Sequence, residues 1–151
     1  MWRIKNYKLG FDPWGLALFL AIMLPNFIWF ALPAPNDVLQ SKSATPLVDS
    51  IAQVFQLIMA AALCAVTNTT RNGPMKRGYQ TGTAVCVVLY FAGWAAYYAG
   101  IVNASVILGL CLVPCGAFLL FALGRKNGIA LISAGAFTVC HLIFASVNFL
   151  I

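Results

Sequence analysis

Long apolar runs alternate with short polar segments along almost the whole chain. A helix advances about 1.5 Å per residue and a bilayer has a hydrocarbon core of about 30 Å, so a spanning helix needs about 20 mostly apolar residues. The pattern predicts an all-α fold, a polytopic integral membrane protein whose single domain covers residues 1–151. The five predicted helices cover approximately residues 15–32, 47–66, 81–101, 104–123 and 129–151.

Two of the predicted helices begin at a polar residue followed by proline. Asp12 precedes Pro13, and Thr45 precedes Pro46. A small polar side chain can accept hydrogen bonds from the first N–H groups of a helix, and proline suits the first helical position because it has no N–H to satisfy. These pairs predict where the first two helices start. Between the third and fourth helices only residues 102–103 remain, which predicts a tight antiparallel hairpin.

The positive charges lie almost entirely on one side of the predicted bundle. Lys and Arg are enriched in the cytoplasmic loops of membrane proteins. Only Lys42 lies in a loop on the opposite side. We therefore predict a cytoplasmic N-terminus and an outside C-terminus, in a plasma membrane of the bacterial type. The remaining eight positive residues are Arg3, Lys5, Lys8, Arg71, Lys76, Arg77, Arg125 and Lys126.

Composition excludes a water-soluble fold and several classes of function. The chain is 62% hydrophobic and 8% charged, whereas globular domains are about half apolar and a quarter charged. The net charge of +6 does not indicate nucleic acid, because the positive residues cluster between apolar runs and not along a polar face. The chain shows no phosphate loop, nucleophile elbow or paired carboxylates. We expect the lipid bilayer as its surroundings, and no cofactor.

Polar and aromatic side chains recur at helical spacing inside the predicted spans. Such groups are costly in hydrocarbon, so they mark either contacts between helices or a functional site. On the second helix, Asp49, Gln53 and Gln56 share one face, because their spacings of four and three residues match the helical repeat. The other candidates are Asn26 and Trp29 on the first helix, Tyr90, Trp94 and Tyr97 on the third, and His141 and Asn148 on the fifth.

These candidates also coincide in depth. Counted at about 1.5 Å per residue, Gln56, Tyr90 and His141 lie near the bilayer midplane, and most of the others lie toward the outer face. The pattern predicts an outward-facing pocket for a small amphipathic or cationic molecule. Asp49 is its expected charge partner, with Gln53, Gln56 and His141 as the hydrogen-bonding floor and Trp29, Trp94 and Tyr97 as the walls.

Two other interpretations remain open. The same groups can hydrogen-bond helix to helix, at roughly 0.6 to 2 kcal/mol each. If their partners lie in a homo-oligomer or another protein, the chain is a membrane-embedded interaction or assembly subunit. An intramembrane enzyme would depend on His141, but Ser146 lies about 140° away around the same helix and cannot pair with it. We therefore do not expect an enzyme.

Overall fold

The computed structural model describes residues 3–4, 6–70 and 73–149. Five long helices account for most of this part of the chain, and the predicted helical bundle is confirmed. The helices are α1 (Pro13–Ala31), α2 (Pro46–Ala65), α3 (Arg77–Tyr98), α4 (Ala104–Gly124) and α5 (Gly128–Phe149). The short elements are β1 (Arg3–Ile4), β2 (Tyr7–Leu9), the 3-10 helix η1 (Val38–Gln40) and β3 (Val66–Asn68).

Length and hydropathy make all five helices candidates for membrane spans. They contain 19 to 22 residues each, and every one includes an apolar stretch long enough to cross the hydrocarbon core. Many large apolar side chains are exposed on their outer faces, as they are on protein that lipid surrounds. These features suggest an integral membrane protein.

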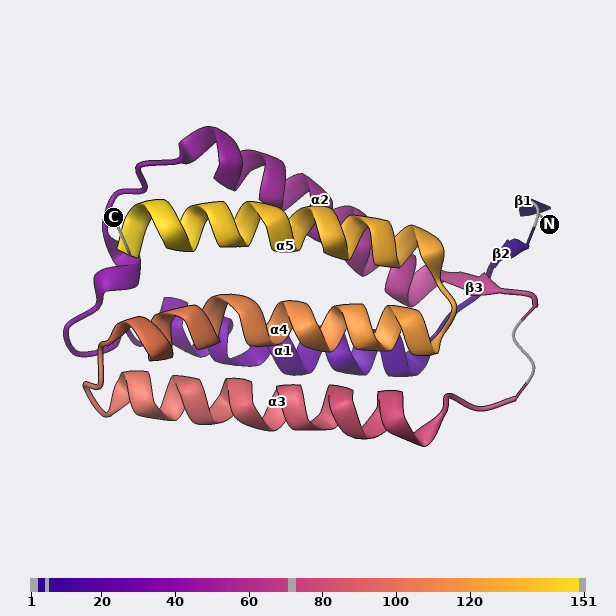
Figure 1. The fold of residues 1–151 in the computed structure, drawn as a ribbon, viewed down its shortest axis with the longest axis horizontal. Helices are drawn as coiled ribbons and strands as arrows, with labels where there is room; N and C mark the ends of the chain where they lie inside the picture. Colours follow the sequence, from indigo (N-terminus) through magenta and orange to yellow (C-terminus); the bar gives the residue numbers. More distant parts are fainter. Residues whose placement is uncertain (1–2, 5, 71–72, 150–151) are drawn as a thin grey trace.

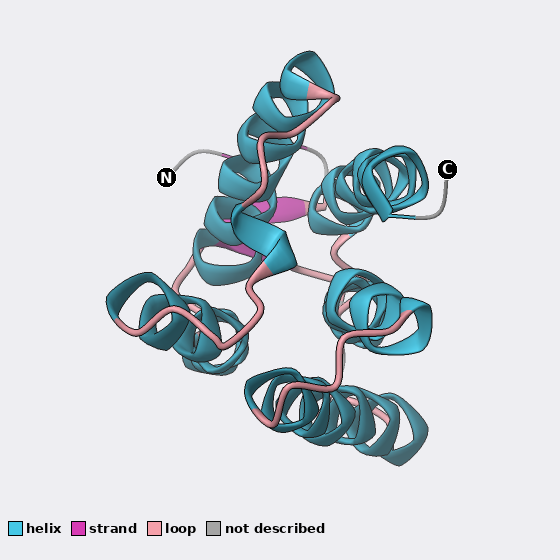
Figure 2. Ribbon diagram, turned by 90° about the vertical axis from the view of Figure 1, so that its left-hand side faces the viewer, coloured by secondary structure: helices cyan, strands magenta, loops and turns pink. Residues whose placement is uncertain are grey.

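The helices form a ring in the order α1, α2, α5, α4, α3. Figure 1 shows α2 and α5 side by side along one edge of the bundle and α3 along the opposite edge. The view along the helices in Figure 2 shows the ring end on. Helix α4 is the most buried of the five. Helix α1 packs mainly on α2 and only lightly on α3, which leaves the ring weakly closed at that point.

The close contact between α1 and α2 depends on Gly15. This glycine is buried, and a Cβ added to it would collide with the backbone carbonyl of Leu63. A backbone atom cannot move aside as the end of a side chain can. Glycine therefore lets the start of α1 lie directly against the end of α2.

The third helix starts and ends earlier than predicted. It covers 77–98, whereas its apolar run predicted 81–101. It stops because Gly100 adopts a φ of 84°, while the N–H groups of Gly100 and Ile101 donate to the carbonyls of Tyr97 and Ala96 at 3.0 Å. This Schellman arrangement ends a helix at a glycine. The connection to α4 is therefore residues 99–103, longer than the predicted pair.

The N-terminal segment forms a small antiparallel sheet that hydropathy did not predict. Its strand order is β1-β2-β3, and Lys8 pairs with both Arg3 and Thr67. The pairing continues into α2, since Gly10 and Asp12 donate their N–H groups to the carbonyls of Ala65 and Cys64 at 3.0 and 2.8 Å. The last carbonyls of a helix have no partner within it. The sheet thus completes the hydrogen bonding at the end of α2.

Asn127 fastens the turn between α4 and α5 to this same end of the bundle. Its side chain is almost fully buried, at 3% exposure. Nδ2 donates to the carbonyls of Ala62 and Val66 at 2.8 and 2.9 Å, and Oδ1 accepts from the N–H of Ala130 at 3.1 Å. One amide therefore both starts α5 and holds it to α2.

Replacing Asn127 with alanine should lower the free energy of unfolding by about 1 to 3 kcal/mol, because it leaves buried backbone groups without partners. Reversible unfolding in mixed micelles measures this change. The exposed Asn6 provides a control, and its replacement by alanine should change stability by less than about 0.5 kcal/mol. Equal effects of the two substitutions would contradict the role assigned to Asn127.

Candidate functional site

The ring encloses a cavity near the end that η1 covers. The cavity has three adjoining compartments of about 240, 430 and 200 Å³. Trp29 of α1 and His141 of α5 line all three compartments, so the compartments meet at these two side chains. We call this space the outer cavity. Its volume lies in the range of small-molecule sites in proteins.

Most of the residues that helical spacing singled out meet at this cavity. Eight of the ten line at least one compartment, although they come from four different helices. Tyr97 and Asn148 line none of the three. The eight are Asn26, Trp29, Asp49, Gln53, Gln56, Tyr90, Trp94 and His141.

Asn26 connects α1 to α3 across the cavity. Its Nδ2 donates to the Tyr90 hydroxyl at 2.8 Å and to the carbonyl of Ile22 at 3.0 Å. The residue before it is Pro25, which has no N–H to offer the preceding turn. The side chain of Asn26 bonds to the carbonyl of Ile22 and not to that of Ala21, which Pro25 leaves without its usual donor. It also holds Tyr90 in position.

An aromatic wall surrounds Trp94. Its ring lies 6.2 Å from that of Trp29, 6.3 Å from Tyr90 and 5.8 Å from Tyr97, measured between centroids. The Tyr90 and Tyr97 contacts are edge to face, a favoured arrangement for aromatic pairs. Trp94 is only 6% exposed, and its indole Nε1 lies beside the Tyr90 hydroxyl without making a hydrogen bond of good geometry within the described part of the chain. A buried indole N–H normally finds an acceptor.

His141 presents a second buried polar atom without a protein partner. Its ring stacks 4.1 Å from Phe137 between centroids, and Nδ1 has no hydrogen-bond partner among the described residues. The nearby Gln56 donates only to the sulfur of Met23, at 3.5 Å. Because most buried polar groups in proteins are hydrogen-bonded, two such atoms from α3 and α5 on one compartment require an explanation.

Asp37 holds η1 across the end of the ring opposite the sheet. Its two carboxylate oxygens accept from Trp29 Nε1 and from the Tyr97 hydroxyl, both at 2.7 Å. The same hydroxyl accepts from the N–H of Leu39 at 3.2 Å. Figure 2 shows η1 lying over the centre of the ring. The 3-10 helix η1 therefore lies over part of the outer cavity, while the compartment lined by the exposed Ser41 and Gln53 remains partly open.

Tyr97 and Asn148 hold the covering segment, although they were predicted to line the pocket. Tyr97 is fully buried and binds Asp37. Asn148 accepts from the N–H of Ala44 at 2.7 Å and donates to Thr45 Oγ1 at 3.1 Å. Both lie at the end of a helix where the loop returns over the bundle. The loop contacts both side chains, and Asn148 also lines a separate pocket of about 430 Å³ between this loop and the start of α4.

Some cavity residues escaped the sequence analysis because they are apolar. Phe137 and Phe144 line the compartments on either side of His141, and Leu39 reaches them from η1. The two phenylalanines lie four residues before and three residues after the histidine, so helical spacing could have included them. Leu39 has no such signal, since it belongs to the covering segment.

Comparisons with known proteins found no match to the chain among protein-family models, curated proteins or solved structures.

Proposed function

We propose that this protein binds, senses or translocates a small amphipathic or cationic molecule in the outer cavity. One observation carries the proposal: His141 Nδ1 is buried without a protein partner among the described residues, and it shares a compartment with Trp94, whose buried indole N–H lies beside the Tyr90 hydroxyl without a hydrogen bond of good geometry. A ligand that hydrogen-bonds to both nitrogens would satisfy them. Leaving such groups unsatisfied costs about 1 to 3 kcal/mol each.

The walls favour a ligand with an apolar or cationic body. Trp29, Tyr90 and Trp94 contribute aromatic rings whose surfaces attract apolar groups and whose faces attract positive charge. Asp49 lines the largest compartment at its rim, beside Ser43. Its negative charge supports binding of a cation that also carries an aromatic or aliphatic group.

We further propose that the chain lies in a plasma membrane of the bacterial type, with its N-terminus in the cytoplasm and its C-terminus outside. Support comes from the charge distribution, since Lys and Arg concentrate at the end of the bundle that carries the sheet. Cytoplasmic loops favour these residues. The outer cavity then belongs to the half of the membrane that faces away from the cytoplasm.

Binding of benzyltrimethylammonium, a small aromatic cation, tests the proposal. We expect the purified protein to bind it and to melt at a higher temperature in its presence, because a ligand that binds only the folded state stabilises that state. A second, matched probe is the neutral amphiphile benzyl dimethylamine oxide, whose oxygen can accept a hydrogen bond. Trp94→Phe keeps a ring but removes the N–H. It should weaken binding of the amine oxide by about tenfold, or 1.4 kcal/mol. Isothermal titration measures both affinities.

Trp14→Phe provides the matched control, because Trp14 lies at the other end of α1 and is 69% exposed. It should leave both affinities unchanged. If neither probe binds the wild-type protein, the outer cavity is not a site for this class of ligand. Equal affinities of the Trp94→Phe and wild-type proteins for the amine oxide would remove the hydrogen bond from the proposal.

The second candidate function is an assembly subunit, and Gln53 favours it. Gln53 lines the largest compartment but is also exposed at the surface of α2, and an amide exposed to hydrocarbon without a partner is costly. A helix of a second copy or of another protein can satisfy it. The mass of the detergent-solubilised protein distinguishes the two candidate functions. An assembly that dissociates when Gln53 is replaced with leucine supports the subunit. A monomer that binds benzyltrimethylammonium supports the pocket.

A further inference from the structure

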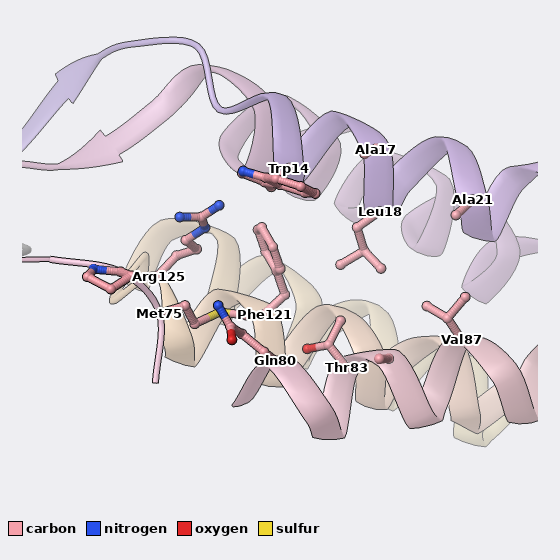
Figure 3. A pocket seen from close by; sticks show the side chains of 12 residues that line it. Trp14, Ala17, Leu18, Ala21, Met75, Gln80, Thr83, Val87, Phe121 and Arg125 are labelled. Atoms are coloured by element: carbon pink, nitrogen blue, oxygen red, sulfur yellow. The ribbon is translucent and has the colours of Figure 1, made fainter. Parts of the chain in front are cut away.

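A second pocket, of about 550 Å³, lies near the end of the bundle that carries the sheet. We call it the inner pocket; it is bordered by α1, α3 and α4, where the ring is weakly closed. Figure 3 shows Ala17 and Ala21 of α1 facing Thr83 and Val87 of α3 across the space. Alanine side chains are too short to fill the gap between these helices, so the space stays open.

Two walls of the inner pocket, those of α3 and of the end of α4, change from polar to apolar in the same direction, and the wall of α1 is apolar throughout. On α3, Gln80 and Thr83 come first and Val87 follows. The distance from Gln80 to Val87 along the helix is about 10 Å. On α4, Arg125 lies at the polar end and Phe121 one turn further in. The pocket therefore matches an elongated molecule with one polar and one apolar end.

Thr83 provides a specific polar point inside this pocket. The residue is 7% exposed, and its Oγ1 has no hydrogen-bond partner in the described part of the chain. A threonine in a helix commonly bonds to a carbonyl three or four residues earlier, but Thr83 does not. Its hydroxyl is thus a buried donor that a ligand's acceptor would satisfy.

The charges at the polar end favour an anionic headgroup. Lys76 and Arg77 are exposed and follow Met75, which lines the pocket. The acid nearest to them, Asp12, is bound by Arg125 through contacts of 3.0 and 3.1 Å. Because Asp12 and Arg125 neutralise each other, the rim of the pocket keeps the positive charges of Lys76 and Arg77. Such basic clusters at a membrane surface attract anionic lipids.

We propose that the inner pocket binds an anionic phospholipid. The phosphate lies at Lys76 and Arg77, the Thr83 hydroxyl donates to an ester carbonyl, and one acyl chain enters between α1 and α3 toward Val87. The order phosphate, ester, hydrocarbon in the lipid follows the order of residues along α3. This site is separate from the outer cavity and stands whether or not that cavity binds a ligand.

Native mass spectrometry of the full chain in detergent tests the proposal with phosphatidylglycerol and phosphatidylcholine of identical acyl chains. We expect one phosphatidylglycerol to bind at least about tenfold more tightly than phosphatidylcholine. Ala17→Leu places a larger side chain in the pocket and should weaken phosphatidylglycerol binding at least about tenfold. Ala61→Leu, on an exposed position of α2, is its control and should leave binding unchanged.

A second pair of variants tests the hydroxyl. Thr83→Val should weaken phosphatidylglycerol binding several-fold, whereas Thr81→Val, at an exposed position of the same helix, should not. The melting temperature of each variant without added lipid shows whether it still folds. Equal binding of the two lipids, unchanged binding by a folded Ala17→Leu protein, or displacement of phosphatidylglycerol by an equal concentration of glycerol phosphate would overturn the proposal.

Discussion

Replacing Asp12 with alanine is expected to lower the free energy of unfolding by about 3 to 5 kcal/mol, because it breaks a largely buried ion pair. Asp12 contacts Nε and Nη2 of Arg125 at 3.0 and 3.1 Å, and the side chains of Asp12 and Arg125 are 10% and 12% exposed. The same carboxylate accepts from the N–H groups of Trp14 and Gly15 at 3.1 and 3.4 Å. One substitution therefore removes both the start of α1 and its link to α4.

Unfolding in mixed micelles measures this loss, and a double substitution separates its two causes. In Asp12→Ala with Arg125→Leu no buried charge remains, so much of the loss should be recovered. The part that persists should be about 1 kcal/mol, the usual value of a helix cap. A cost below about 1 kcal/mol for Asp12→Ala alone would show that water solvates this pair and that it does not hold α1 to α4.

Replacing Asp37 with alanine is expected to open the cover of the outer cavity. Asp37 accepts from Trp29 and Tyr97 at 2.7 Å each, and a hydrogen bond to a charged group contributes about 1.5 to 3 kcal/mol. Loss of both should favour the open arrangement by at least about 3 kcal/mol, which is a change of more than about 100-fold in its population. The helical bundle below should remain intact.

The N–H of Leu39 is the direct probe of this opening, because it donates to the Tyr97 hydroxyl in the closed arrangement. Its hydrogen exchange should accelerate by about 100-fold in Asp37→Ala, and benzyltrimethylammonium should enter and leave the cavity faster. Gln40→Ala, an exposed change in the same segment, should alter neither rate. Unchanged exchange at Leu39 in Asp37→Ala would mean that other contacts hold η1 in place.

Helical spacing identified much of the outer cavity but could not show what each face meets. Asp49 and Gln56 both line the cavity, as their shared face on α2 predicted. Tyr97 follows the same periodicity as Trp94 on α3, yet its hydroxyl binds Asp37 of the loop. Periodicity shows that two side chains point the same way, and the packing partner in front of them decides whether they line a space or hold a segment.

The inner pocket was not predicted because its residues carry no joint pattern. Gln80 and Thr83 share one face of α3 at a spacing of three residues, but Arg125 follows α4 and no spacing in the sequence connects it with them. The pocket lies where α1 makes few contacts with α3 and α4, while on the other side of α1 Gly15 lets this helix approach α2 closely. A close approach on one side of α1 thus accompanies a space on its opposite side.

The amino-acid sequence by itself determined the five helices and the start of α1 at Asp12, because hydrophobic length and helix capping depend on residues close together in the chain. Only the tertiary structure decided the order of the helices around the ring, the cover at Asp37 and the two pockets. Those features join residues as far apart as Asp12 and Arg125, which are separated by 113 positions. Contacts at that separation follow from how the helices pack against one another.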